Sequence, residues 1–122
     1  MMEKVQSHRL EVHTRYFDLI EKKIKTFEGR VNKPKYQKIK SGDSIEFAPE
    51  ESSSRLVIAK VLGIHKFKSF KEMIEQVGLF QCLPGVDSIE EGVNIYHSFP
   101  QYKEDAEKFG VVAFKIQVVS DV

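Results

Sequence analysis

The chain has 122 residues, 41% hydrophobic and 30% charged, and its 19 Lys and Arg against 18 Asp and Glu leave a formal net charge of +1. This length fits one domain over residues 1–122, because domains commonly contain roughly 100–150 residues. The composition is typical of a globular protein and excludes a disordered or low-complexity chain.

The first part of the chain predicts two strands with a helix between them. Polar and apolar side chains alternate over residues 8–12, which indicates a strand with one face in the core. Thr14 is suited to cap a helix that ends near Lys23. The apolar stripe of this helix consists of Phe17, Ile20 and Ile24. Residues 25–30 alternate again and predict a second strand.

Two further strands are expected in the middle of the chain. Residues 44–47 form the first, with Ile45 and Phe47 facing inward. Residues 55–67 are β-branched and mostly apolar, which is typical of a central strand that is covered on both sides or wrapped into a barrel.

Capping signals predict two helices in the second half. Ser69 with Glu72 starts one helix, which Gly78 ends, and Ser88 with Glu91 starts another, which runs to about Ser98. A last strand covers residues 110–119. One face of this strand carries Val112, Phe114, Ile116 and Val118.

This order of elements predicts an α+β fold. A small mixed or antiparallel sheet that curls into a β-barrel, with helices covering its openings, accommodates it. A flat two-layer α+β sandwich is the alternative.

Neither a membrane segment nor an export signal is expected. The longest apolar stretch, residues 56–64, is interrupted by Lys60 and is far shorter than the roughly 20 residues that span a bilayer. The residues MMEKVQSHRL lack the apolar region of a signal peptide. Cys82 is the only cysteine, which excludes an internal disulfide and agrees with a reducing compartment. We therefore expect a cytoplasmic or nuclear protein.

Common catalytic and cofactor-binding motifs are missing from the sequence. It contains no GxSxG, P-loop, GxGxxG or HExxH. Cys82 lies in the apolar context LFQCLPG, which is typical of an inert buried thiol. His8 and His13 face opposite sides of one strand, whereas His65 and His97 could meet in space. We expect no cofactor and no metal.

The segment KIKTFEGR, residues 23–30, is the candidate site. In a strand, Glu28 and Arg30 share one face, so the carboxylate can hold the guanidinium. A free guanidinium edge and the Lys25 ammonium would then face outward and bind a phosphate or a carboxylate. The alternative is a solvated strand face with exposed ion pairs worth about 0–1 kcal/mol each.

Six motifs, in order along the chain, resemble the ASCH domain family, a group of PUA-like β-barrels. Lys25, Glu28 and Arg30 match the last three fixed positions of its G-x-K-x-x-E-x-R signature. The other matches are I-K-S-G-D at 39–43, K-F-K-S-F-K-E at 66–72, L-P-G at 83–85 with S-I-E-E-G at 88–92, and G-V-V-A-F-K-I at 110–116. The resemblance covers almost the whole chain.

This resemblance implies a barrel with a cleft lined by the lysine, the glutamate and the arginine, in a family thought to bind RNA. Lys23 stands where the signature has glycine, so a different turn or some strain is expected there. Some members look like enzymes, either ribonucleases or amidohydrolases that act on acylated cytidine. The amidohydrolases use a threonine three residues after the lysine, where this chain has Glu28, and Thr26 lies at a different spacing.

Three functions remain open. The first is binding of RNA or a nucleotide. It is suggested by an excess of basic residues between Arg15 and Lys40, where nine are basic and three are acidic. The predicted binding residues are Lys23, Lys25, Glu28, Arg30, Lys35, Tyr36 and Lys38. The second is a small hydrolase acting on RNA or a modified nucleoside, with Lys25 and Glu28 as the catalytic pair.

The third function is binding of a protein partner in a transcription or translation complex. The acidic segment from Asp87 to Glu107, with its aromatic side chains, would supply that surface. Those aromatic residues, Tyr96, Phe99 and Tyr102, could equally form the far wall of the cleft opposite Arg30.

Overall fold

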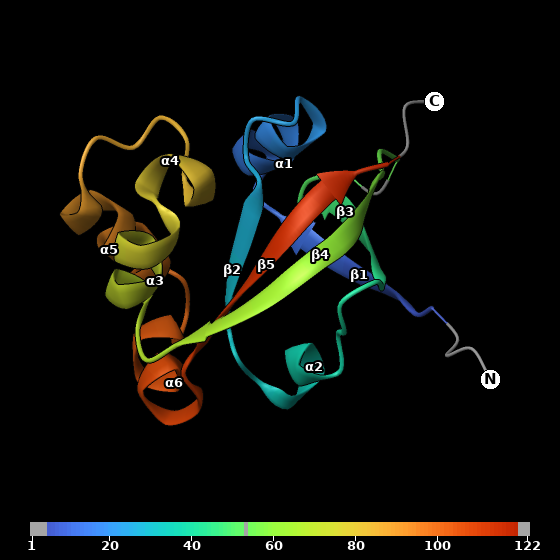
Figure 1. Cartoon of the computed structure of the whole chain (residues 1–122). Coiled ribbons are helices and arrows are strands. Elements are labelled where there is room, and N and C mark those ends of the chain that lie inside the picture. Colours follow the sequence, from blue (N-terminus) through green and yellow to red (C-terminus); the bar gives the residue numbers. More distant parts are fainter. Residues whose placement is uncertain (1–4, 53, 120–122) are drawn as a thin grey trace.

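A curled five-stranded sheet forms the centre of the molecule (Figure 1). The computed structural model describes residues 5–52 and 54–119. Its strands are β1 (Ser7–Val12), β2 (Phe27–Val31), β3 (Ser44–Pro49), β4 (Val57–Phe67) and β5 (Val111–Val118). They lie in the order β1-β3-β4-β5-β2, with β1 parallel to β3 and all other neighbours antiparallel. This mixed, curled sheet with helices confirms the predicted α+β class and the predicted curl of the sheet toward a barrel.

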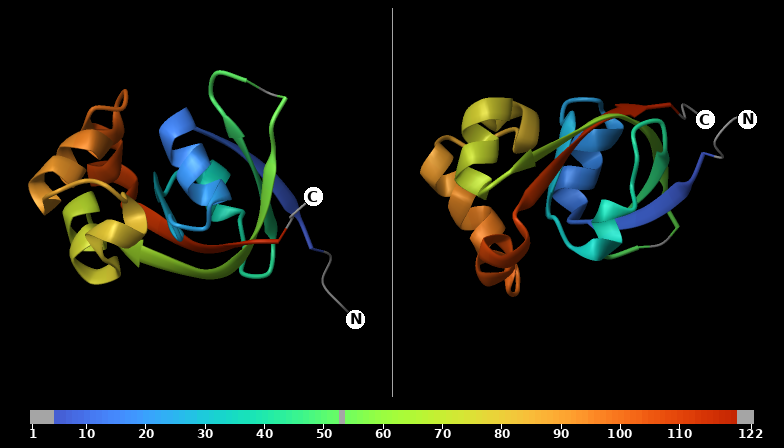
Figure 2. Two further views of the ribbon diagram at one scale, coloured as in Figure 1. Left: turned by 90° about the horizontal axis from the view of Figure 1, so that it is seen from above. Right: turned by 60° about the horizontal axis from the view of Figure 1, so that its bottom comes forward.

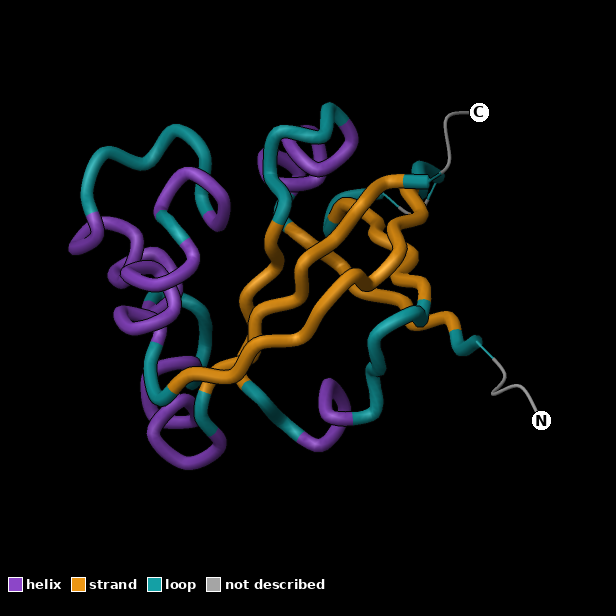
Figure 3. The backbone as a smooth tube through the Cα atoms, in the orientation of Figure 1, coloured by secondary structure: helices purple, strands orange, loops and turns teal. Residues whose placement is uncertain are grey.

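Six helices are present among the described residues. They are α1 (Thr14–Glu21), α2 (Pro34–Gln37), α3 (Phe70–Val77), α4 (Leu79–Cys82), α5 (Ile89–His97) and α6 (Tyr102–Phe109). The helix α1 lies within the curve of the sheet (Figure 2). The helices α3 to α6 gather on one side, next to β2 and one end of β4 and β5 (Figure 3).

The concave side of the sheet holds the first hydrophobic cluster. Alternation along β5 directs Val112, Phe114 and Ile116 into it, as predicted. The helix α1 adds Phe17 and Ile20, both fully buried, and so fills one opening of the barrel. A register shift between Val61 and Gly63 in β4 bends the strand at this point.

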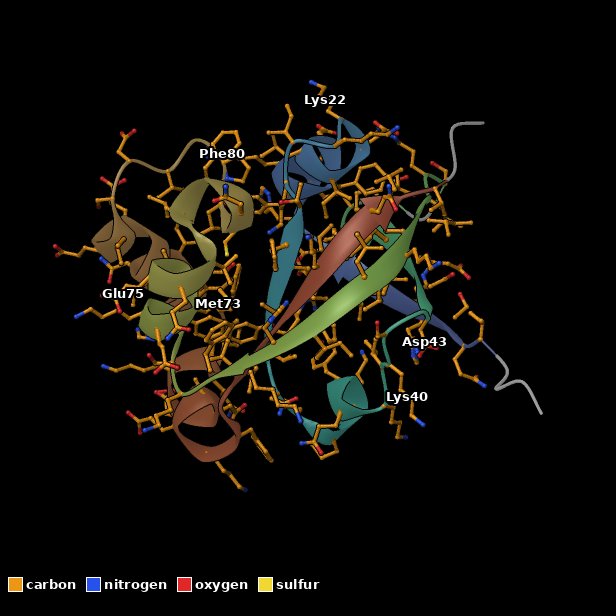
Figure 4. All side chains as sticks on the ribbon, viewed as in Figure 1. Lys22, Lys40, Asp43, Met73, Glu75 and Phe80 are labelled. Atoms are coloured by element: carbon orange, nitrogen blue, oxygen red, sulfur yellow. The ribbon has the colours of Figure 1, made fainter. Side chains whose placement is uncertain are left out.

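The convex side of β2 and β5 packs against α3 to α6 and holds the second cluster. Val111 and Ala113 of β5 face Met73 and Ile74 of α3 there. Met73 points from α3 toward the sheet, and Glu75 points away from it (Figure 4). Because alternate residues of β5 enter different clusters, the first half of this strand, residues 111–114, is buried on both faces, whereas Lys115 and Gln117 are exposed.

Several local predictions need correction. The cap of α1 is His13, whose Nδ1 accepts a hydrogen bond from the Arg15 amide, and Thr14 already belongs to the helix. Ile24 lies beyond the helix and is 38% exposed, so it is not part of the buried stripe. In β4, Ile58 and Leu62 are exposed on the outer face, so the first half of this strand is covered on one side alone.

Both predicted capping signals are confirmed. The Ser69 hydroxyl accepts a hydrogen bond from the Glu72 amide at 3.1 Å, and Ser88 accepts one from Glu91 at 3.1 Å. The helix α3 ends before Gly78, at φ 116°, as expected for a glycine at this position. The helices α2, α4 and α6 are additions to the predicted elements.

Candidate functional site

The candidate site lies at β2, one of the two edge strands of the curled sheet. Glu28 pairs with Phe114 of β5, and Arg30 pairs with Val112. Because paired residues point to the same side, the two charged side chains face the concave side of the sheet. Gly29 points to the convex side, toward the helices. The predicted two-residue alternation is therefore correct for Glu28 and Arg30.

Three charged side chains meet at this edge. Arg30 Nε lies 2.7 Å from Glu28 Oε2, and Lys25 Nζ lies 3.4 Å from Glu28 Oε1. Lys25 and Glu28 are buried, with 3% and 6% of their surface exposed. Each oxygen of the carboxylate therefore faces a cation, in a place that excludes most water.

The Lys25 ammonium does not face outward, contrary to the prediction. It donates hydrogen bonds to the carbonyl oxygens of Phe27 and Cys82 in addition to its contact with Glu28. An ammonium group has three donor protons and no acceptor, so these three partners occupy it fully. Lys25 therefore connects β2 to α4 instead of offering a free charge.

The Arg30 guanidinium spans the gap between the two sheet edges. One terminal nitrogen donates to the Glu11 carbonyl oxygen in β1 at 2.8 Å, and the other donates to the Tyr36 hydroxyl at 3.1 Å. In the described residues, no backbone ladder joins β1 to β2, so this side chain links the two edges of the open barrel. Each of its three nitrogens donates to a protein acceptor, which uses three of the five N–H donors of the guanidinium, so the cation predicted to face outward is largely occupied within the protein.

The ionisation of the three side chains follows from their contacts. Burial raises the pKa of Glu28, but Arg30 and Lys25 lower it by more, so the carboxyl pKa ends below its usual range. Burial lowers the pKa of Arg30, but Glu28, with smaller contributions from Tyr102 and Tyr36, raises it by more, so the net shift is upward. Glu28 is thus a carboxylate and Arg30 a cation at neutral pH.

A cavity of about 230 Å³ opens beside these residues. Its strand side presents Lys25, Glu28 and Arg30, and its helix side presents aromatic and apolar side chains. The residues around it are Glu11, Val12, His13, Tyr16, Lys25, Glu28, Gly29, Arg30, Glu50, Leu83, Ile95, Tyr96, Phe99, Pro100 and Tyr102. The predicted far wall of Tyr96, Phe99 and Tyr102 is confirmed.

The charge around the cavity differs from the expectation of a site for anions. Two cationic residues, Lys25 and Arg30, stand against three acidic ones, Glu11, Glu28 and Glu50. Both cations already have partners within the protein. A phosphate inside the cavity would therefore meet carboxylates and few available donors, whereas an uncharged ring would meet aromatic walls.

The other predicted binding residues lie outside the cavity. Tyr36 is half-buried and contacts Arg30 through its hydroxyl and its ring, whose centroid is 5.5 Å from the guanidinium carbon. Lys23, Lys35 and Lys38 are exposed and are not among the residues that line the cavity. The structure thus brings four of the seven residues together.

Comparison with known proteins identifies the family. The family model described as the ASCH domain matches residues 10–120. The chain belongs to the ASCH domain family. No curated protein matches it.

Two similar chains of known structure match this chain over nearly its whole length. A hypothetical protein, PH0355, is 39% identical, with a TM-score of 0.83 over 93% of this chain and 100% of that chain. Protein PF0455 from Pyrococcus furiosus is 36% identical, with a TM-score of 0.76 over 94% of this chain and 99% of that one. The ZmASCH S128A mutant from Zymomonas mobilis is 14% identical, with a TM-score of 0.59 over 89% of this chain and 66% of that one, so the likeness extends to the fold alone.

The first signature position of this ASCH domain has an unusual backbone. Lys23 adopts a φ of 66°, in the left-handed region that glycine occupies most readily. Its amide donates to the Ile20 carbonyl, and the Ile24 amide donates to the Leu19 carbonyl. These two bonds form a Schellman motif at the end of α1. The left-handed turn of the signature is therefore kept, with lysine in place of glycine.

Several cavity residues escaped the sequence interpretation. Glu50 and Leu83 come from two separate segments, and nothing in their local pattern indicates that they converge. Cys82 is buried, and burial raises its thiol pKa to about 11, which agrees with the predicted inert thiol.

Within residues 5–52 and 54–119, no three His, Cys, Asp or Glu side chains gather as metal ligands would. The helices in this part of the chain are too short or too polar to cross a membrane.

Proposed function

We propose that this ASCH domain binds single-stranded RNA or a nucleotide by taking one base into the cavity beside Arg30. The observation that carries the proposal is a cavity of about 230 Å³ with aromatic side chains on one wall and a hydrogen-bonded polar trio on the other. This volume is below the roughly 300–1,000 Å³ of pockets for drug-sized ligands, so it suits a single flat ring. The family, generally regarded as RNA-binding, points to the same ligand class.

Stacking would supply most of the affinity. Phe99 and Tyr102 lie edge to face, with ring centroids 5.2 Å apart, and Tyr16 faces the cavity from α1. Stacking of a base on an aromatic side chain contributes about 1–3 kcal/mol and tolerates different sequences. The carboxylate of Glu50 offers an acceptor at the cavity wall for ligand amino or hydroxyl groups.

Phosphates would remain outside the cavity, near exposed lysines. Lys35 lies over the ring of Tyr36, with 5.4 Å between its Nζ and the ring centroid, and Tyr36 contacts Arg30. We place Lys23, Lys35 and Lys38 in this outer role. In a plot of log affinity against log salt concentration, each contact with a phosphate of a single strand changes the slope by roughly −0.7. With three lysines in this role, log affinity is expected to fall by at most about 2 for each tenfold rise in salt concentration.

Hydrolysis receives less support than binding. Lys25 would have to give up a proton to act as a base, yet all three of its donor protons have acceptors. Glu28 is held in its ionised form, so it is a poor proton donor at neutral pH. The hydroxyl groups among the described cavity residues belong to tyrosines, and no serine or threonine lines the cavity there.

The test measures binding of a labelled single-stranded RNA of about ten nucleotides by fluorescence anisotropy, with free nucleosides as competitors. Phe99→Leu keeps an apolar side chain in the wall but removes the stacking ring, and should weaken binding about 5- to 100-fold. Phe80→Leu is the matched control, because Phe80 on α4 is 60% exposed and lies outside the cavity (Figure 4). Equal losses in both variants, or no competition by any nucleoside, would contradict a base-binding cavity.

A further inference from the structure

One buried hydroxyl in the cavity wall lacks a partner. In the described part of the chain, the Tyr96 hydroxyl is the buried side-chain oxygen or nitrogen that makes no hydrogen bond. Tyr96 is 4% exposed, and its ring stacks on Phe70 with 4.3 Å between centroids and 6° between planes. The ring is therefore held firmly, and the hydroxyl stays where the ring places it.

The position of this hydroxyl is set by Gly29 of β2. A Cβ atom at Gly29 would lie 3.1 Å from Tyr96 Oη and 2.7 Å from Met73 Sδ and Cε. Gly29 and Tyr96 both line the cavity. The glycine thus lets the phenol approach the strand beside Glu28 and Arg30.

Neighbouring groups leave the hydroxyl as an unused donor. Burial raises the pKa of Tyr96 well above its usual range, and nearby Cys82 and Glu28 raise it further, so the group keeps its proton. Both oxygens of Glu28 already accept from cations, at 2.7 Å from Arg30 and 3.4 Å from Lys25. Buried polar groups are normally hydrogen-bonded, so an unpaired hydroxyl at a cavity wall needs an explanation, and a ligand that accepts its hydrogen bond would supply one.

We infer that Tyr96 determines specificity, because its hydroxyl donates a hydrogen bond to a carbonyl oxygen of the bound base. This inference rests on the proposed function, since it assigns the class of base that the cavity prefers. Uracil, cytosine and guanine carry a ring carbonyl, whereas adenine carries none. A site built to hydrogen-bond a particular group rejects a ligand without it, because the buried donor would then stay unpaired.

The inference is tested with Tyr96→Phe, which removes the hydroxyl and keeps the ring that stacks on Phe70. Binding of uridine, cytidine, guanosine and adenosine is measured by competition against the labelled RNA, for the wild type and the variant. The wild type should prefer the three carbonyl-bearing nucleosides. The variant should bind these about 3- to 10-fold more weakly and bind adenosine within about twofold of the wild type, as expected for one lost hydrogen bond.

A stability measurement on the ligand-free protein separates a binding role from a structural one. If the hydroxyl is unpaired without ligand, Tyr96→Phe should leave the urea midpoint unchanged or raise it. A lower midpoint combined with unchanged nucleoside preference would mean that the hydroxyl serves the fold, and would overturn the inference. Ser98→Ala, which removes an exposed hydroxyl near the end of the same helix, should change neither binding nor preference.

The outcomes also distinguish this inference from the proposed function. If the wild type binds RNA and nucleosides but Tyr96→Phe keeps the wild-type preference, the assignment of Tyr96 fails while base binding stands. If the wild type binds no nucleoside and no RNA, both fail.

Discussion

Glu28 is the residue on which the charged trio depends. It is buried between Lys25 and Arg30, and its removal leaves two cations without a carboxylate in a place with little water. Breaking a buried ion pair by removing one partner commonly costs about 3–5 kcal/mol. We expect Glu28→Gln to lower the free energy of unfolding by about 3 kcal/mol or more, measured by urea denaturation at pH 7. Glu75→Gln, on the exposed face of α3, should stay within about 0.5 kcal/mol of the wild type.

The same carboxylate makes stability depend on pH in a definite direction. The folded-state pKa of Glu28 is lowered, so its contribution is present above the unfolded value of about 4.3 and is lost as pH falls through the folded value. Asp43, which His8 contacts at 2.8 Å, has a lowered pKa too, so the loss below pH of about 4 is shared. Glu28→Gln should therefore lose less stability between pH 7 and pH 3 than the wild type. An equal loss in both proteins would mean that Glu28 is not stabilised as an anion.

The sequence predicts part of this trio and not the rest. A strand repeats every two residues, so the pairing of Glu28 with Arg30 follows from local geometry. Lys25 precedes β2, and its partners include the Cys82 carbonyl, 57 residues further along the chain. Its burial therefore depends on the packing of α4 against β2, which no local pattern contains. The expected outward-facing ammonium was wrong for this reason.

At the scale of elements, the turn from α1 to β2 contains a measurable strain. Lys23 occupies the left-handed position of the Schellman motif, where a Cβ atom costs roughly 1 kcal/mol. Lys23→Gly should be more stable than Lys23→Ala by about 1 kcal/mol in urea denaturation, because both variants lose the lysine side chain and the glycine alone relieves the backbone. Equal stability of the two variants would show that this turn bears no strain.

Helices α3 and α5 were predictable because a capping serine precedes each of them. Helix α6 was missed although signals for it exist. Tyr102, Ala106 and Phe109 recur at helical spacing, and Gly110 follows the last turn at φ 75°. The segment is otherwise polar. Pro100 indicates the end of a helix more strongly than these signals indicate the start of the next one. The short helices α2 and α4, of four residues each, have too few positions for a period to be detected.

In the described part of the chain, two hydrophobic clusters are joined by β5. The curl of the sheet was predictable from the order of strands and helices, but the packing of α3 to α6 on its convex side was not. Val111 and Ala113 lie on the face of β5 opposite to the predicted apolar face, and they are buried because these helices cover them. The cavity forms where this helical layer meets the open edge between β1 and β2. Its aromatic wall therefore depends on how segments far apart in the sequence pack together.

Because β5 contributes to both clusters, we expect the molecule to unfold in one cooperative transition. Phe114→Ala in the barrel cluster and Met73→Ala in the helical cluster remove fully buried side chains, and should each cost about 2–5 kcal/mol. Gln117→Ala, exposed on the same strand, should cost under about 0.5 kcal/mol.

Far-ultraviolet circular dichroism follows all elements, and near-ultraviolet signals follow the four tyrosines, of which Tyr16, Tyr96 and Tyr102 belong to the helical cluster. Within each variant, the far-ultraviolet and near-ultraviolet signals should change at the same urea concentration, although the midpoint differs between variants. If Met73→Ala instead shifts the tyrosine signal alone, the helical layer unfolds separately, and the aromatic wall of the cavity can be lost while the barrel remains folded.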